Sequence, residues 1–301
     1  MKVRRAFLPI LILSIVICLA VGAFNGKIMS AQAAEDAPVT PSGSLISAEQ
    51  LNKILNQPDL TVIDARQRDI YAQGHIPGAI HFNIRYVADP NRRGKFISPK
   101  LFSLAMRESG VNATDRIVVY GDNYDQARLW FLLNLYGLNV RMLNGGFAQW
   151  KAKGYEITAG REKRNILGKF DIAGEQPKEP ALIDTVGVAA AMNQPGKNVI
   201  IDARSAEEYG NKGHIRGAVN ITWDQLVNRD MTFKSASDLK NIFSKAGVSP
   251  EKQVIIYSGN SARASFVYFA LTKILGYNNV KIYDGFFVYW AIQRPLVKGN
   301  R

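Results

Sequence analysis

Two short stretches decide the fold of this chain: Val62-Ile-Asp-Ala-Arg66 and, a few residues on, Gly74-His-Ile-Pro-Gly-Ala79. Both return about 139 residues later, as Ile200-Ile-Asp-Ala-Arg204 and Gly213-His-Ile-Arg-Gly-Ala218. Solenoid repeats are about 20 to 50 residues long, so a period of this size indicates two duplicated domains instead of a solenoid.

The repeat extends to further segments in the same order. They are the apolar runs Ile117-Val-Val-Tyr120 and Val254-Ile-Ile-Tyr257, and the closing elements Asn144-Gly-Gly-Phe147 with Trp150 and Asp284-Gly-Phe286 with Trp290. Short β-branched runs alternate with helical patterns, as in Leu129–Leu135 before Val140–Leu143. This alternation predicts an α/β fold in which each domain is a mainly parallel sheet flanked by helices. Gly137 and Gly276 fall where helices are expected to end.

Length and composition agree with two globular domains. The chain has 301 residues, of which 47% are hydrophobic and 21% charged, and this excludes a disordered chain. One cysteine, Cys18, excludes a disulfide framework and a cysteine-based zinc site. The histidines His75, His81 and His214 have no metal-binding spacing, so neither a metal nor a cofactor is predicted.

The N-terminus has the pattern of a secretory signal. Basic residues precede an apolar run from Ala6 to Phe24, and Ala31-Gln32-Ala33 has the small-x-small pattern that signal peptidase accepts. We expect residues 1–33 to be removed and the protein to be periplasmic or otherwise exported. The alternative is an uncleaved membrane anchor, because the apolar run is long enough to span a bilayer.

The remaining chain divides into a flexible leader (34–43), a first domain (44–158), a linker (159–180) and a second domain (181–298). Removal of the signal takes away four basic residues and no acidic one, so the formal charge falls from +13 to +9. This basicity favours anions. Nucleic acid is not a predicted partner, because the lysines and arginines are scattered along the sequence.

Taken together, these motifs resemble those of the tandem rhodaneses, the thiosulfate and 3-mercaptopyruvate sulfurtransferase family with two homologous α/β domains. The resemblance covers nearly the whole chain after the signal. It implies a catalytic loop after the central strand of the second domain, where a cysteine carries sulfane sulfur as a persulfide. In this chain Ser258 occupies the cysteine position. The corresponding segment of the first domain, Gly121 to Arg128, is two residues longer and also has no cysteine.

Neither loop can therefore hold a persulfide, and we predict no catalytic residue. A serine hydroxyl cannot replace the thiol, because its pKa lies far above the thiol value of about 8.5. What remains is an anion-binding loop between a strand and a helix N-terminus, whose backbone N–H groups and dipole favour negative charge. Its predicted members are Ser258, Gly259, Asn260, Ser261, Ala262 and Arg263.

Arg204 is a further candidate, since by resemblance it matches a substrate-contacting arginine of tandem rhodaneses. The alternative is a structural pair with a neighbouring carboxylate, because Arg66 repeats the residue in the domain with the divergent loop. The sequence thus predicts an exported rhodanese-like protein without sulfurtransferase activity that binds an oxyanion, a sulfur compound or a protein partner. The alternative function is a thiosulfate sulfurtransferase. A membrane is a partner only if the N-terminal segment is uncleaved.

Overall fold

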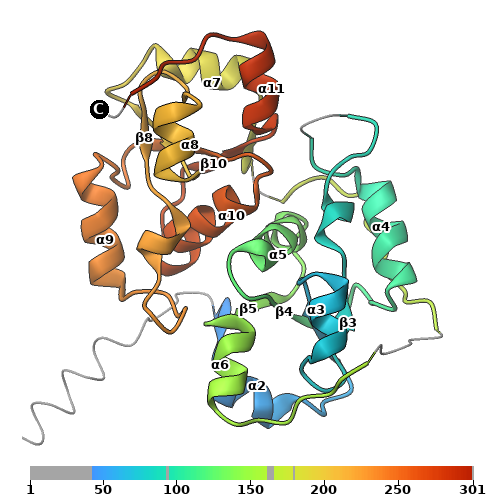
Figure 1. Cartoon of the computed structure of the whole chain (residues 1–301). Coiled ribbons are helices and arrows are strands. Elements are labelled where there is room, and N and C mark those ends of the chain that lie inside the picture. The colour runs from blue at the N-terminus through green and yellow to red at the C-terminus, as the bar shows by residue number, and fades with distance from the viewer. Residues whose placement is uncertain (1–42, 93–94, 161–165, 179, 300–301) are drawn as a thin grey trace, which may run out of the picture. The chain divides into compact units, whose positions relative to one another are not determined.

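The computed structural model describes residues 43–92, 95–160, 166–178 and 180–299 (Figure 1). The predicted signal, residues 1–33, and all of the leader except Gly43 lie outside these residues. Within the described ranges, no helix combines the length and apolarity needed to cross a membrane.

The first copy of the repeat alternates strands and helices. Its elements are β1 (Leu45–Ile46), α2 (Ala48–Ile54), β2 (Leu60–Asp64), α3 (Arg68–Gln73), β3 (Ile80–His81), η1 (Ile84–Val87), α4 (Pro99–Glu108), β4 (Arg116–Tyr120), α5 (Asp125–Leu135), β5 (Val140–Leu143) and α6 (Gly146–Ala152). The strands form one parallel sheet in the order β1-β5-β4-β2-β3.

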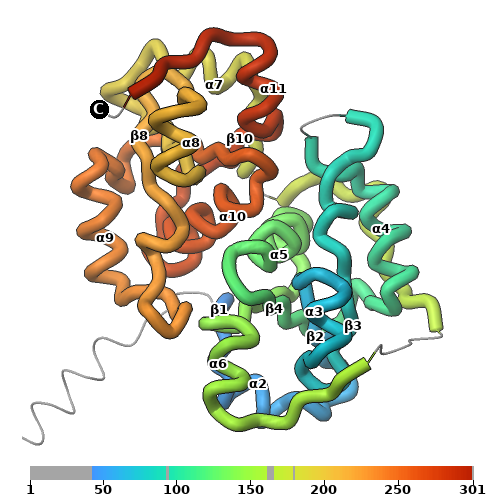
Figure 2. The backbone as a smooth tube through the Cα atoms, in the orientation of Figure 1, coloured from blue at the N-terminus to red at the C-terminus, as the bar shows by residue number. Residues whose placement is uncertain are grey.

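The second copy repeats this arrangement. Its elements are β6 (Leu182–Ile183), α7 (Thr185–Met192), β7 (Asn198–Asp202), α8 (Ala206–Asn211), β8 (Ala218–Asn220), η2 (Trp223–Leu226), α9 (Ala236–Lys245), β9 (Gln253–Tyr257), α10 (Ala262–Phe269), η3 (Ala270–Ile274), β10 (Val280–Tyr283) and α11 (Phe286–Gln293). The parallel sheet has the order β6-β10-β9-β7-β8, which matches the first sheet strand for strand. Figure 2 traces both copies, the first in blue to green and the second in yellow to red. The predicted fold class is confirmed.

Both faces of each sheet are covered. Successive strand residues point to opposite faces, and in β2 the side chain of Val62 packs with Leu51 of α2 and Trp150 of α6. The next residue, Ile63, belongs to the core on the other face, which includes α5. The continuous apolar runs of the sequence follow from this burial on both sides.

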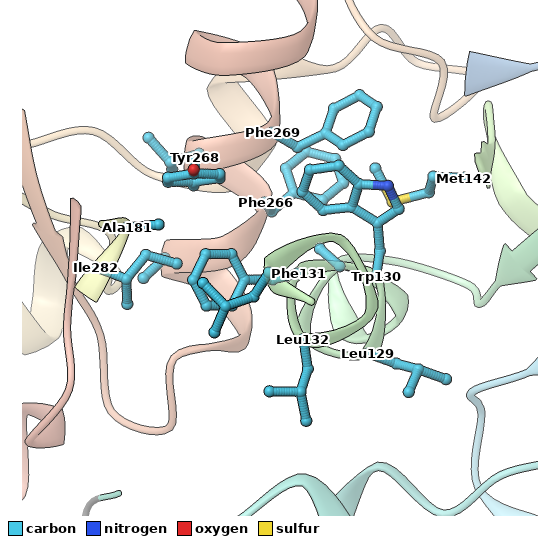
Figure 3. Close-up of a cluster of buried hydrophobic side chains, with 14 of the residues drawn as sticks. Leu129, Trp130, Phe131, Leu132, Met142, Ala181, Phe266, Tyr268, Phe269 and Ile282 are labelled. Atoms are coloured by element: carbon cyan, nitrogen blue, oxygen red, sulfur yellow. The ribbon is translucent and has the colours of Figure 1, made fainter. Parts of the chain in front are cut away.

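Aromatic side chains of α5 and α10 pack against each other (Figure 3). The rings of Trp130 and Phe269 lie edge to face with centroids 4.6 Å apart, and those of Phe131 and Tyr268 are 5.0 Å apart. One buried cluster therefore includes residues from both copies.

The loops after the central strands are equally long in the two copies. Residues 121–124 join β4 to α5, and residues 258–261 join β9 to α10. The expectation of a longer first loop was wrong. The two additional residues of the second copy lie in its helix, where α10 continues into the π-helical turn Ala270–Ile274. As expected, Gly137 and Gly276 follow the helix ends, both with positive φ.

Candidate functional site

The candidate loop lies where the central strand β9 ends and α10 begins. Ser258 follows the last residue of the strand and is only 1% exposed. Its carbonyl accepts a hydrogen bond from the Phe287 N–H at 3.0 Å, which attaches the loop to the start of α11. In open α/β sheets, ligand sites form at this carboxyl edge, because strand ends and helix N-termini meet there.

Two side chains of the loop accept hydrogen bonds from N–H groups at the N-terminus of α10. The Ser258 hydroxyl accepts from the Ala264 N–H, and the Asn260 side-chain oxygen accepts from the Ala262 N–H, both at 3.2 Å. The predicted loop was two residues too long, because Ala262 and Arg263 already belong to the first turn of α10. In this structure the Ser258 hydroxyl satisfies an N–H of the first turn of α10, whose N-cap residue, Ser261, makes no such side-chain bond.

Ser261 has a strained backbone. Its φ of 62° lies in the left-handed region, which favours glycine, and the residue is completely buried. Its hydroxyl donates to the neighbouring Asn260 carbonyl at 2.6 Å. The loop therefore keeps a conformation suited to glycine although serine occupies the position.

Arg263 is held by a carboxylate that sequence reasoning missed. Its guanidinium donates to both oxygens of Glu208, Nη1 to Oε2 at 2.5 Å and Nη2 to Oε1 at 3.3 Å. Although burial acts in the opposite direction, hydrogen bonds from Arg263 and Ser205 lower the pKa of the Glu208 carboxyl to about 2. The capping box from Ser205 to Glu208 was visible in the sequence, but the pairing across 55 residues was not.

One aromatic side chain, Tyr124, lies close to this ion pair, and a second packs against it. Tyr124, from the loop of the first copy, lies 5.2 Å from Trp223 between ring centroids, and both residues are half-buried. Burial raises the pKa of the Tyr124 hydroxyl, and the charge of Arg263 acts in the opposite direction. Neither aromatic residue was predicted: Trp223 lies outside the repeated motifs, and no role was assigned to Tyr124 within the segment Gly121 to Arg128.

Arg204 belongs to a buried network. Its guanidinium contacts both oxygens of Asp202, donates to the Gly213 carbonyl at 2.7 Å, and lies 3.4 Å from the centroid of the Phe287 ring. Burial disfavours its charge, yet the hydrogen bond and charge of Asp202 raise the pKa of Arg204. The residue is 1% exposed, so these contacts favour the structural ion pair over contact with a dissolved substrate.

The same network explains the repeated motifs. The Tyr257 hydroxyl donates to Asp202 at 2.7 Å and accepts from the Ile215 N–H at 3.1 Å. In the first copy, Arg66 likewise pairs with Asp64 and donates to the Gly74 carbonyl. The Asp-Ala-Arg segment at the end of β2 or β7 is thus joined to the Gly-His-Ile turn before the edge strand of the same sheet.

The histidines of the repeated motifs are structural. His75 stacks on Tyr71 with ring centroids 3.9 Å apart, and His214 stacks on Tyr209 at 3.7 Å. Both are buried. Among the residues that the structure describes, no group of three or more histidine, cysteine or acidic side chains could hold a metal ion.

The first copy has a different polar environment at its loop. Counted from the strand end, Gln126 occupies the place of Arg263, so the expected match of Arg128 to Arg263 was wrong. Arg128 lies further into the helix, and burial lowers its pKa to about 10. The exposed Asp122 lies 3.7 Å from Arg66. The two loops share their length but not their charges.

The fold and this loop define a protein of two α/β domains, each with a strand-to-helix loop at the carboxyl edge of its parallel sheet. The family model of the Rhodanese-like domain matches residues 47–153 and 185–293. The chain is 32% identical to the 3-mercaptopyruvate sulfurtransferase of Escherichia coli K12, across 83% of this chain and 96% of the relative. It is 30% identical to the sulfur carrier protein TtuD of Thermus thermophilus, across 85% and 97%.

A solved structure agrees with these sequence comparisons. The crystal structure of SseA, a 3-mercaptopyruvate sulfurtransferase from Escherichia coli, has a TM-score of 0.73 and 31% identity. The similarity covers 81% of this chain and 98% of that one. The chain therefore belongs to the rhodanese family, as a tandem-domain member.

Proposed function

We propose that this chain is a rhodanese-like protein without sulfurtransferase activity that binds a small oxyanion or sulfur compound at residues 258–263. One observation carries the proposal: Ser258, buried at the catalytic position of the family, has a hydroxyl that accepts a hydrogen bond from the Ala264 N–H of α10. Sulfur transfer needs a thiolate there, and Cys18, the one cysteine in the sequence, lies in the predicted signal.

The anion-binding proposal rests on donors at the loop. The N–H groups of Gly259, Asn260 and Ser261 precede a helix N-terminus, where the dipole favours negative charge. Arg263 supplies a charged fork that suits an oxyanion. A protein partner with an exposed carboxylate could use the same donors. The competing function, thiosulfate sulfurtransferase, draws support from the names of the relatives and lacks the nucleophile.

Glu208 sets the strength of binding in this proposal. Its carboxylate occupies the Arg263 fork and remains ionised above a pH of about 2, so an incoming anion must displace it. We expect Glu208→Gln to tighten binding of thiosulfate and sulfate about tenfold, because the competing charge is lost. Glutamine at this position preserves the capping box. Isothermal titration calorimetry measures the two affinities.

Glu207→Gln is the matched control. Glu207 lies on the same helix, is exposed, and carries the same charge, so its loss changes net charge equally without releasing Arg263. Its effect should remain below about twofold at physiological salt because of screening. If both variants gained affinity for the anions equally, the change in net charge alone would explain the gain. If neither the wild type nor a variant bound the anions, the anion site would be refuted.

We also propose export, on the basis of the N-terminal sequence described above. Residues 1–33 contain the basic start, the apolar run and the Ala31-Gln32-Ala33 site. Mass spectrometry of the protein isolated from its host should show a chain beginning at or close to Ala34. An intact N-terminus in the membrane fraction would instead establish an anchor.

A further inference from the structure

A cavity opens in the second domain, apart from the candidate loop. Its volume is about 460 Å³, and none of residues 258–263 lines it. Its walls come from α7, from α11 and from the segment after α11. The lining residues are Ala189, Met192, Asn193, Arg216, Trp290, Arg294, Pro295, Leu296 and Val297.

The first copy shows how the corresponding tryptophan, Trp150, is covered. There the Tyr155 ring covers Trp150 with centroids 4.9 Å apart, and the indole N–H of Trp150 donates to the Glu156 carbonyl at 2.8 Å. Gly154, with a φ of 69°, turns the chain after α6 so that these contacts can form.

Backbone pairing fixes how the two copies correspond. Thr158 pairs with His75 in the first copy, and Val297 pairs with His214 in the second. Counting back from these pairs, Arg294 replaces Tyr155 and Pro295 replaces Glu156. Counting forward from the two histidines, Arg216 replaces Pro77. Both arginines of the cavity are therefore specific to the second copy.

These replacements leave the cavity unfilled. Arg294 has an extended backbone directly after α11, and its guanidinium carbon lies 5.7 Å from the Trp290 ring centroid. Within the described part of the chain, the indole nitrogen of Trp290 has no hydrogen-bond partner, although the residue is only 2% exposed. The second copy thus lacks both contacts that cover Trp150 in the first copy, the tyrosine ring and the hydrogen bond of the indole N–H.

The lining combines an apolar wall with two cations. Ala189, Met192 and Leu296 adjoin Trp290, and the exposed Arg216 and Arg294 supply guanidinium groups, with no acidic side chain among the lining residues. Guanidinium forks match carboxylates, and a cavity of this size suits a small organic ligand. We propose that this cavity binds a small aromatic carboxylate, whose ring takes the place that Tyr155 has in the first copy.

The probe for the test is 3-(4-hydroxyphenyl)propionate, which carries the tyrosine ring and a carboxylate. We expect saturable binding by calorimetry, weakened about tenfold by Arg216→Gln, because one charged fork is lost. Arg294→Tyr restores the residue of the first copy and should abolish binding by filling the cavity. The same phenol without a carboxylate, 4-ethylphenol, should bind at least about tenfold more weakly.

Arg229→Gln is the charge control, since Arg229 is exposed on the same domain and does not line the cavity. It should bind like the wild type. The proposal is overturned if the wild type shows no saturation at about 5 mM probe, if Arg229→Gln weakens binding as much as Arg216→Gln, or if 4-ethylphenol binds as tightly. Binding should be unchanged in Glu208→Gln, so failure here is distinct from failure of the anion loop.

Discussion

Wild-type protein incubated with thiosulfate and cyanide should form no thiocyanate, whereas the double variant Ser258→Cys, Ser261→Gly should form it catalytically. In that reaction the thiolate introduced at position 258 attacks the outer sulfur of thiosulfate, the sulfur–sulfur bond breaks and sulfite leaves. Cyanide then removes the sulfur as thiocyanate and regenerates the thiolate. Thiocyanate colorimetry follows turnover, and mass spectrometry detects the added sulfur atom.

The structure supplies the reason for this gain. The Ser258 hydroxyl lies at the N-terminus of α10 and accepts from the Ala264 N–H, so a thiol there would be stabilised as the thiolate. Glycine in place of Ser261 removes the left-handed strain, which costs roughly 1 kcal/mol for an ordinary residue. Ser258→Cys alone should therefore be less active than the double variant.

Ser244→Cys provides the control for reactivity of any added thiol. Ser244 is exposed on α9, away from the candidate loop, so this variant should form no thiocyanate above background. Robust turnover by the wild type would contradict the proposed loss of sulfur transfer. If the double variant is folded and inert, the loop has not kept a geometry that activates a thiol.

Asp202→Ala should destabilise the second domain by about 3–5 kcal/mol. The substitution leaves the guanidinium of Arg204, 1% exposed, without its carboxylate, and a buried charge that loses its partner is costly. The hydroxyl of Tyr257 loses its acceptor at the same time. Urea denaturation followed by circular dichroism measures the change, and the two domains are fitted as separate transitions if they unfold separately.

Asp59→Ala is the matched control, because it also removes one aspartate of an aspartate–arginine pair. Asp59 contacts Arg116 at 2.6 Å, but its side chain is 57% exposed, so water replaces the lost contact. We expect no measurable change in the free energy of unfolding. An Asp202→Ala protein as stable as Asp59→Ala would show that the network does not support the domain.

The fold was predictable from the sequence because it depends on local patterns that occur twice. The apolar runs, the helix-ending glycines and the repeated motifs each specify a strand, a helix or a turn, and the duplication shows which residues correspond. The role of the Asp-Ala-Arg motif was only half predictable. Its spacing allowed both an ion pair with Asp202 and contact with a ligand, and side-chain burial favours the ion pair.

The missed parts of the site depend on contacts between distant residues. Glu208 meets Arg263 across 55 positions, and Tyr124 of the first copy meets Trp223 of the second. No periodicity or motif records such rotamer-dependent contacts. The length of the candidate loop was misjudged for a related reason. The loops of the two copies were compared by matching Arg128 with Arg263, and the sequence does not show that the helix already begins at Ala262.

The π-helical turn Ala270–Ile274 shows how the two copies diverged after duplication. The segment from Tyr257 to Gly276 is two residues longer than the corresponding segment from Tyr120 to Gly137 in the first copy. The two additional residues lie within the helix. A π-helical turn has i→i+5 hydrogen bonds and therefore takes up more residues than an α-helical turn. The difference in length between the two copies thus lies in the helix, whereas the strand-to-helix loop has the same length in both copies, and neither loop contains a cysteine.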